Sequence, residues 1–128
     1  MKVYISGPMR GFSQCNFSLF DKAQAALEAA GWTVFSPVQH ERELGFDPSL
    51  TTDCSNDFLA QSGFVMKTSI LWDLQAIAES DAIVMLPGWS NSSGANLELH
   101  FAEFLKLDIG FYQKDGTVDW IKNWVGSR

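Results

Sequence analysis

Apolar and polar positions in the first third of the chain follow the periods of a strand, a helix and a second strand. Residues 2–6, KVYIS, and residues 32–35, WTVF, are short β-prone runs, each closed by a segment that contains Gly or Pro. Between them, apolar side chains recur every three or four residues from 16 to 31, which is the spacing of an amphipathic helix that ends at Gly31. The pattern therefore predicts a strand, a helix and a strand in succession.

The middle of the chain carries a weak helical signal, then an irregular stretch, then a strong helical signal. Residues 39–44 predict a short helix, whereas residues 45–63 contain Pro, Thr, Ser, Asn and Asp without a clear period. A connection of this length in a small domain is usually a lid or a pocket wall, or else partly disordered. Helical spacing returns in residues 65–79, where apolar side chains such as Ile70 and Ile77 share one side.

The second half of the chain begins with its most apolar stretch. Residues 82–86, AIVML, form an almost continuous apolar run, which is typical of a central parallel strand covered on both faces. Residues 96–107 then predict a helix and residues 109–112 a further strand. The last predicted element is a short helix over residues 118–125, which carries two tryptophans.

The order of these elements indicates one α/β domain over residues 1–128. Strands and helices alternate, which is typical of a three-layer, doubly wound (Rossmann- or flavodoxin-like) parallel sheet. With right-handed crossovers we expect four to five strands in an order near 2-1-3-4. Ligands of such sheets bind beyond the carboxyl ends of the strands, here at the switch between the first and third strands.

Two small, polar loops follow those two strand ends. They are residues 6–11, SGPMRG, and residues 87–94, PGWSNSSG. The second loop opens a helix, whose free N–H groups and positive end suit an anion. The hydroxyl groups of Ser90, Ser92 and Ser93 are candidates for the same anion site, although one of them would serve as an ordinary N-cap.

Four side chains near the expected cleft are candidates for chemistry. Glu98 is a candidate nucleophile whose pKa the helix N-terminus and a tyrosine hydroxyl would lower; the alternative is an ordinary first-turn glutamate. Asp73 lies among apolar neighbours, either as a second acid or as a helix-surface aspartate. Tyr4 shares a strand face with Ser6 and could donate to a carboxylate, or lie in the core with its hydroxyl satisfied elsewhere. Arg10 could pair with a phosphate or remain a solvated surface arginine.

Composition and charge exclude several classes of partner and cofactor. The net charge of −6 argues against a nucleic-acid polymer, because phosphate backbones need a basic face. Neither loop matches a dinucleotide or P-loop fingerprint, so we expect no cofactor. Cys15 and Cys54 fit neither a disulfide framework nor a metal site, which makes the reducing cytoplasm the expected compartment. With no signal-peptide pattern and no apolar run of membrane-spanning length, we expect no membrane association.

Three stretches together resemble a known family. They are SGPMRG after the first strand, the Asp73-Leu74 pair ahead of SDAIV, and the segment SSGANLE that ends at Glu98. In order and spacing they resemble the nucleoside 2-deoxyribosyltransferase superfamily. The arginine in PMRG and the serine six residues before Glu98 are more similar to the 2′-deoxynucleoside 5′-phosphate N-hydrolases than to the transferases. The resemblance covers residues 1–111, with residues 46–63 poorly matched.

The resemblance implies a role for each matched residue. Glu98 corresponds to the glutamate that attacks the anomeric carbon and forms a covalent glycosyl-enzyme. Asp73 corresponds to the general acid/base that assists departure of the base and later activates water, and Tyr4 to the tyrosine that orients the nucleophile. Gly7, Met9, Arg10 and Gly11 correspond to the loop that wraps the sugar and phosphate, and Ser92 and Gly94 to the 5′-phosphate contacts. Ser90 and Ser93 are added as substrate-binding candidates because of their position in the same loop, not because of the resemblance.

The activity implied is cleavage of a (deoxy)nucleoside 5′-monophosphate to a free base and a sugar 5-phosphate. The resemblance also implies a homodimer or a higher homo-oligomer with a shared active site. Two alternatives remain open at this point: a deoxyribosyltransferase, and a non-catalytic protein that binds a small nucleotide. Trp72, Trp89 and Phe12 could stack on the base, or lie in the core or at the dimer interface.

Overall fold

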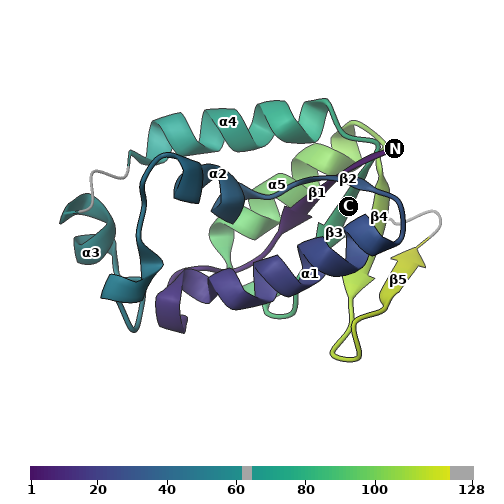
Figure 1. Cartoon of the computed structure of the whole chain (residues 1–128). Coiled ribbons are helices and arrows are strands. Elements are labelled where there is room, and N and C mark those ends of the chain that lie inside the picture. The colour runs from purple at the N-terminus through teal and green to yellow at the C-terminus, as the bar shows by residue number, and fades with distance from the viewer. Residues whose placement is uncertain (62–64, 122–128) are drawn as a thin grey trace.

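The chain folds around one sheet with helices on both faces (Figure 1). The computed structural model describes residues 1–61 and 65–121. The strands are β1 (Lys2–Ser6), β2 (Thr33–Phe35), β3 (Ala82–Met85), β4 (Asp108–Tyr112) and β5 (Val118–Ile121). Their order is β2-β1-β3-β4-β5, in which the first four strands are parallel and β5 is antiparallel to β4. The predicted α/β class and the order 2-1-3-4 are confirmed.

The helices divide between the two faces of the sheet. They are α1 (Phe17–Ala29), α2 (Pro37–Glu43), α3 (Asn56–Gln61), α4 (Met66–Ala78) and α5 (Ser93–Phe104). One apolar layer joins the sheet to α1, and the other joins it to α4 and α5. In Figure 1, α3 lies at the left, on the side toward which β1 points. Among the described residues, no helix is both long enough and apolar enough to cross a membrane.

Side-chain alternation along the central strands builds these two layers. On β1, Val3 and Ile5 face the α1 layer, whereas Tyr4 faces the α4 and α5 layer. Every residue of β3 is buried, as expected for a central parallel strand that is covered on both faces. Because Ser6 pairs with Met85 in the parallel ladder, the carboxyl ends of β1 and β3 lie side by side.

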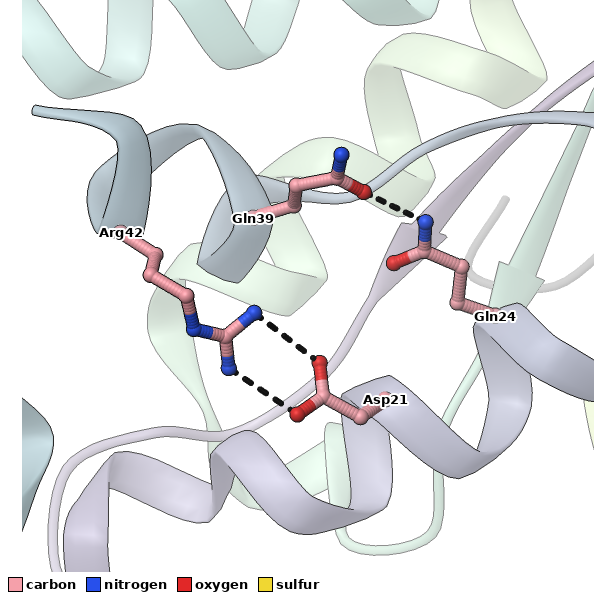
Figure 2. A network of polar contacts seen from close by, with 4 residues as sticks. All are labelled: Asp21, Gln24, Gln39 and Arg42. Carbon is pink, nitrogen blue, oxygen red and sulfur yellow. Dashed lines mark hydrogen bonds and ion pairs between the residues drawn. The ribbon is translucent and has the colours of Figure 1, made fainter.

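A polar network fixes α2 on α1. The guanidinium of Arg42 donates to both carboxylate oxygens of Asp21, at 2.9 and 3.4 Å, and Gln24 donates to Gln39 (Figure 2). Arg42 also lies over the ring of Phe17, 5.3 Å from its centroid. The two helices are thus held together along one side of α2, and another side is free to pack toward α4.

The carboxyl-terminal part of the fold differs from the prediction. Residues 118–121 form β5 rather than the beginning of the helix expected over residues 118–125, and residues 122–125 lie outside the described residues. A tight turn returns the chain after β4, with Gly116 at a φ of +88°. Gly110 permits the close pairing, because a Cβ there would lie within 3 Å of side chains on β5. Cross-strand pairing therefore overrides the helical signal.

The irregular stretch predicted over residues 45–63 contains local structure in its described part. A 3₁₀ turn, η2 (Pro48–Leu50), precedes α3. Phe46 stacks on Phe17 of α1, with ring centroids 5.8 Å apart. Phe46 also meets Phe58 edge-to-face, with ring centroids 5.7 Å apart. These aromatic contacts attach the segment to the α1 layer.

A disulfide bond joins this segment to the loop after β1. The Sγ atoms of Cys15 and Cys54 are bonded, and the two residues are 39 positions apart in the sequence. The expectation that the cysteines form no disulfide is therefore wrong. Two cysteines carry no spacing signal for such a contact, because the fold alone brings the two loops together. With both thiols paired, the cysteines no longer favour a reducing compartment.

Candidate active site

Glu98 occupies the second turn of α5 and faces β1. The hydroxyl of Tyr4 donates to one carboxylate oxygen at 2.9 Å, and the hydroxyl of Ser6 donates to the other at 2.6 Å. Both donors lie on one face of β1 because strand side chains alternate. Glu98 is only 6% exposed, so two fixed donors hold both oxygens of a buried carboxyl group.

Asp73, on α4, completes a cluster of two acids and a phenol. Burial, followed by the negative charge of Glu98, raises the pKa of Asp73 from its ordinary value of 3.8 to about 9. In its protonated form Asp73 hydrogen-bonds to Glu98, which raises the pKa of Asp73 further. Burial and the two acids also raise the pKa of Tyr4, which therefore remains a neutral hydrogen-bond donor. Asp73 keeps its proton at neutral pH.

Burial raises the pKa of Glu98 as well, although hydrogen bonds from Ser6, Asp73 and Tyr4 act in the opposite direction. The expected net lowering by a helix end and a tyrosine is therefore wrong, because the cost of burying the charge is larger. Glu98 accepts these hydrogen bonds as a carboxylate, whereas Asp73 takes part as the protonated donor. The hydrogen bond between the two acids raises the pKa of Asp73 and lowers that of Glu98, so Glu98 is the first of the pair to lose its proton and Asp73 is the one that keeps it.

A cavity of about 670 Å³ opens beside the two acids, which is the size of a small-molecule site. Asp73 and Glu98 contribute to its wall, whereas Tyr4 is fully buried behind them. Gly11 and Ser90 are not part of the described cavity wall. The predicted substrate-binding residues that do line the cavity are Gly7, Met9, Arg10, Ser92, Ser93 and Gly94.

The first turn of α5 forms one end of this cavity. Ser92 is the N-cap, and its hydroxyl accepts a hydrogen bond from a backbone N–H of the first turn at 3.2 Å. The amide of Asn96 donates to three backbone carbonyls within residues 89–92, at 2.8 to 3.3 Å, and so fixes the loop. Ser93 and Gly94 are exposed at the cavity, where the positive end of the helix favours an anion.

The loop after β1 covers another side of the cavity. Gly7 has no room for a side chain, because a Cβ there would lie 2.7 Å from Leu86 at the end of β3. Gly11 has a φ of +83°, and its N–H donates to the carbonyl of Asp53 at 2.6 Å. Arg10 is exposed, with its guanidinium 3.8 Å from a methionine thioether at the start of α4. Arg10 therefore lies at the rim of the cavity.

The disulfide ties this loop to the middle segment. Residues 14–16 all have left-handed backbone conformations, with φ between 51° and 63°, which is strained for residues other than glycine. Asn16 donates to the carbonyl of Pro8 at 2.9 Å and so supports this conformation. Across the disulfide, Cys54 and Leu59 of the middle segment line the cavity. Two side chains of the described part of residues 45–63 thus contribute to the cavity wall.

Several residues of the site were not predicted from the sequence. Ser6 shares a strand face with Tyr4, so alternation could have identified it. Ser69 lines the cavity one helical turn before Asp73, and helical spacing could have identified it. Glu41, only 9% exposed, accepts a hydrogen bond from Ser69 at 2.8 Å. No sequence signal links α2 to α4, so Glu41 could be found only from the fold.

The aromatic residues considered for base stacking have other neighbours. Trp72 stacks on His40, with ring centroids 3.9 Å apart. Trp89 lies 5.7 Å from Phe111 and borders a separate hollow of about 560 Å³. Phe12 is 40% exposed. Within the described part of the chain, none of the three lines the cavity beside the acids.

In residues 1–61 and 65–121, no group of three or more His, Cys, Asp or Glu side chains is arranged to hold a metal ion.

Comparison with known proteins identifies the family of the chain. A search of the curated proteins found no match. A family model described as a domain of unknown function, DUF4406, matches residues 1–111, a range that includes both loops and both acids. The chain therefore belongs to the DUF4406 family.

Proposed function

We propose that the protein is a nucleotide N-glycosidase that cleaves a (deoxy)nucleoside 5′-monophosphate to a free base and a sugar 5-phosphate. The observation that carries the proposal is a pair of hydrogen-bonded acids at the cavity wall, the buried Glu98 and the half-buried Asp73, of which Asp73 is the weaker acid and keeps its proton at neutral pH. Cleavage of a glycosidic bond through an oxocarbenium-like state needs a protonated acid and an ionised one at once.

The reaction follows from the positions of the protons. An oxygen of Glu98 bonds to the anomeric carbon as the carbon–nitrogen bond breaks, and the base leaves with the electron pair and the proton of Asp73. Asp73, now a carboxylate, takes a proton from water, whose oxygen attacks the same carbon and releases Glu98. Tyr4 and Ser6 hold Glu98 in position during both steps. The cycle consumes one water and needs no cofactor.

A phosphate on the sugar suits the polar end of the cavity. The first turn of α5 presents Ser93 and Gly94 there, and Arg10 lies at the rim. A helix end and a guanidinium both favour a dianion. An unphosphorylated nucleoside would leave these groups without a partner, which supports a monophosphate as the substrate.

The test is release of free base from a panel of ribo- and deoxyribonucleoside monophosphates, natural and modified, followed by chromatography. We expect release from at least one member. Glu98→Gln should lower turnover by at least about a thousandfold, while Glu79→Gln, an exposed change at the end of α4, should have no effect. Substantial turnover by Glu98→Gln with every accepted nucleotide would refute the mechanism.

The same assay separates the alternatives. A deoxyribosyltransferase would form a new nucleoside only when an acceptor base is added. A non-catalytic binding protein would return the nucleotide intact after long incubation. Free base without an acceptor supports the hydrolase.

We also propose a homodimer or a higher homo-oligomer in which a neighbouring copy completes the site. The exposed apolar side chains Leu71, Leu97 and Phe104 on α4 and α5 are available for such a contact. Sedimentation analysis would measure the assembly directly. Because nucleoside monophosphates are cytoplasmic metabolites, the cytoplasm remains the proposed location, where the disulfide would be exposed to reduction.

A further inference from the structure

A third carboxylate, Glu41, lies next to the acid pair. It is in the last turn of α2, is only 9% exposed, and accepts a hydrogen bond from the hydroxyl of Ser69 at 2.8 Å. Ser69 and Asp73 are four residues apart on α4, so they share one face of the helix, and both line the cavity. Glu41 is therefore placed behind the cavity wall, about one helical turn from Asp73.

The position of Glu41 is fixed from both sides of α2. Figure 2 shows Gln39 and Arg42 directed toward α1, where they bond to Gln24 and Asp21. Glu41 projects from a different side of the same helix and meets α4 through Ser69. The backbone of Glu41 is thus held on α1 by its neighbours, and its carboxylate is held on α4 by the hydrogen bond from Ser69.

The groups that face Asp73 come from four neighbouring elements. Glu98 lies on α5, Tyr4 on β1 and Glu41 on α2, and the negative charges of Glu98 and Glu41 both favour the protonated form of Asp73. Arg10, in the loop after β1, is a cation at the rim of the same cavity. Its guanidinium lies against a methionine thioether at the start of α4 rather than against an acid.

The basic side chains of α2 and α4 have other neighbours. His40 stacks on Trp72, Arg42 pairs with Asp21, and Lys67 is exposed. Within residues 1–61 and 65–121, no lysine or arginine forms an ion pair with the buried carboxylate of α2. Its negative charge is therefore not neutralised by a direct ion pair, and it acts on the acid pair.

We propose that Glu41 is a positioning residue that keeps the proton on Asp73, so that Asp73 begins each reaction cycle as an acid. The catalytic meaning of this proposal rests on the proposed function. The electrostatic effect itself does not, because it is a property of the folded protein. The experiment can therefore measure the proton on Asp73 with and without turnover.

The first measurement is a carboxyl ¹³C NMR titration of Asp73 in the wild type and in Glu41→Gln. Gln can still accept the hydrogen bond from Ser69, so the fold is retained while the charge is removed. We expect the titration of Asp73 to move by about one pH unit toward lower pH. Glu41→Asp keeps the charge, so Asp73 should titrate close to its wild-type pH in that variant. Glu43→Gln, an exposed change on the same helix, should leave the titration of Asp73 unchanged.

The second measurement is the pH dependence of kcat. Glu41→Gln should move the alkaline limb by the same amount, with KM nearly unchanged, whereas a merely structural role would lower kcat equally at every pH. An unshifted titration of Asp73 in a folded Glu41→Gln variant would overturn the proposal. If the wild type releases no base, the proposed function fails, and the NMR titration still decides the role of Glu41.

Discussion

Replacing Asp73 by Asn should make the protein more stable at neutral and alkaline pH. The protonated carboxyl group of Asp73 donates to Glu98, and the amide of Asn can donate in the same way. Asn has nearly the same shape as Asp and carries no ionisable group. The substitution therefore removes the titration of this position while leaving its packing in place.

The sign of the effect follows from proton binding. Burial and the charge of Glu98 raise the pKa of Asp73 to about 9, from 3.8 in the unfolded chain, so between these values only the folded protein holds the proton. The contribution of Asp73 to the free energy of unfolding is fully present below its pKa in the unfolded chain, and it is lost as the pH rises through its pKa in the folded protein. Each pH unit in this window lowers stability by about 1.4 kcal/mol. From about pH 6 to about pH 8, Asp73 thus costs the wild type about 2.7 kcal/mol, and Asn avoids that loss.

Urea unfolding at several pH values measures the effect. We compare the free energy of unfolding of the wild type and of Asp73→Asn between pH 6 and pH 8, with equal m-values as a check on two-state behaviour. Asp119→Asn, an exposed change on β5 at the edge of the sheet, is the matched control and should follow the wild type. Parallel curves for the wild type and Asp73→Asn would show that Asp73 does not hold the proton, which would remove the basis of the proposed mechanism.

Three further outcomes are expected. Glu98→Gln should still bind a nucleotide that it no longer cleaves, with a Kd within about tenfold of the wild-type KM, as measured by calorimetry. The double change Cys15→Ser and Cys54→Ser removes a disulfide that joins residues 39 positions apart, and it should lower the free energy of unfolding by about 4 kcal/mol in urea titrations. An unchanged urea midpoint of unfolding would show that the disulfide does not form. Arg10→Ala should raise KM for a monophosphate by about tenfold with little change in kcat, because its charged hydrogen bond is lost; Lys22→Ala, an exposed change on α1, is the control.

The spacing of apolar residues was sufficient to predict most of the fold, because the buried faces of strands and helices determine that spacing. The run AIVM in β3 is buried on both faces, and the apolar spacing of α1 matches its buried side. Prediction failed over residues 118–121, where pairing with β4 rather than local spacing decides the structure. It also failed for Cys15 and Cys54, because a contact between two distant loops leaves no local pattern.

The candidate site was predictable only as far as its residues follow local rules. Tyr4 on a strand face and Glu98 near a helix start were identified by alternation and by position. The structure places Glu98 and Asp73 at one cavity wall, and Tyr4 donates to Glu98 from behind that wall. The expected pKa of Glu98 was wrong because the sequence does not show how deeply a side chain is buried. Glu41 was missed because its contact with Ser69 joins two helices that are far apart in the chain.

The register of β1 decides whether the acid pair has its donors. Tyr4 and Ser6 reach Glu98 because they are two residues apart on one strand face, while Val3 and Ile5 fill the α1 layer on the other face. A slip of one residue would exchange the two sets and place aliphatic side chains beside a buried carboxylate. Such a carboxylate without donors costs several kcal/mol, so the slipped arrangement is disfavoured on both faces. Parallel pairing with β2 and β3 fixes the register on both sides, which means that the contacts that build the core also place the two hydroxyl donors against Glu98.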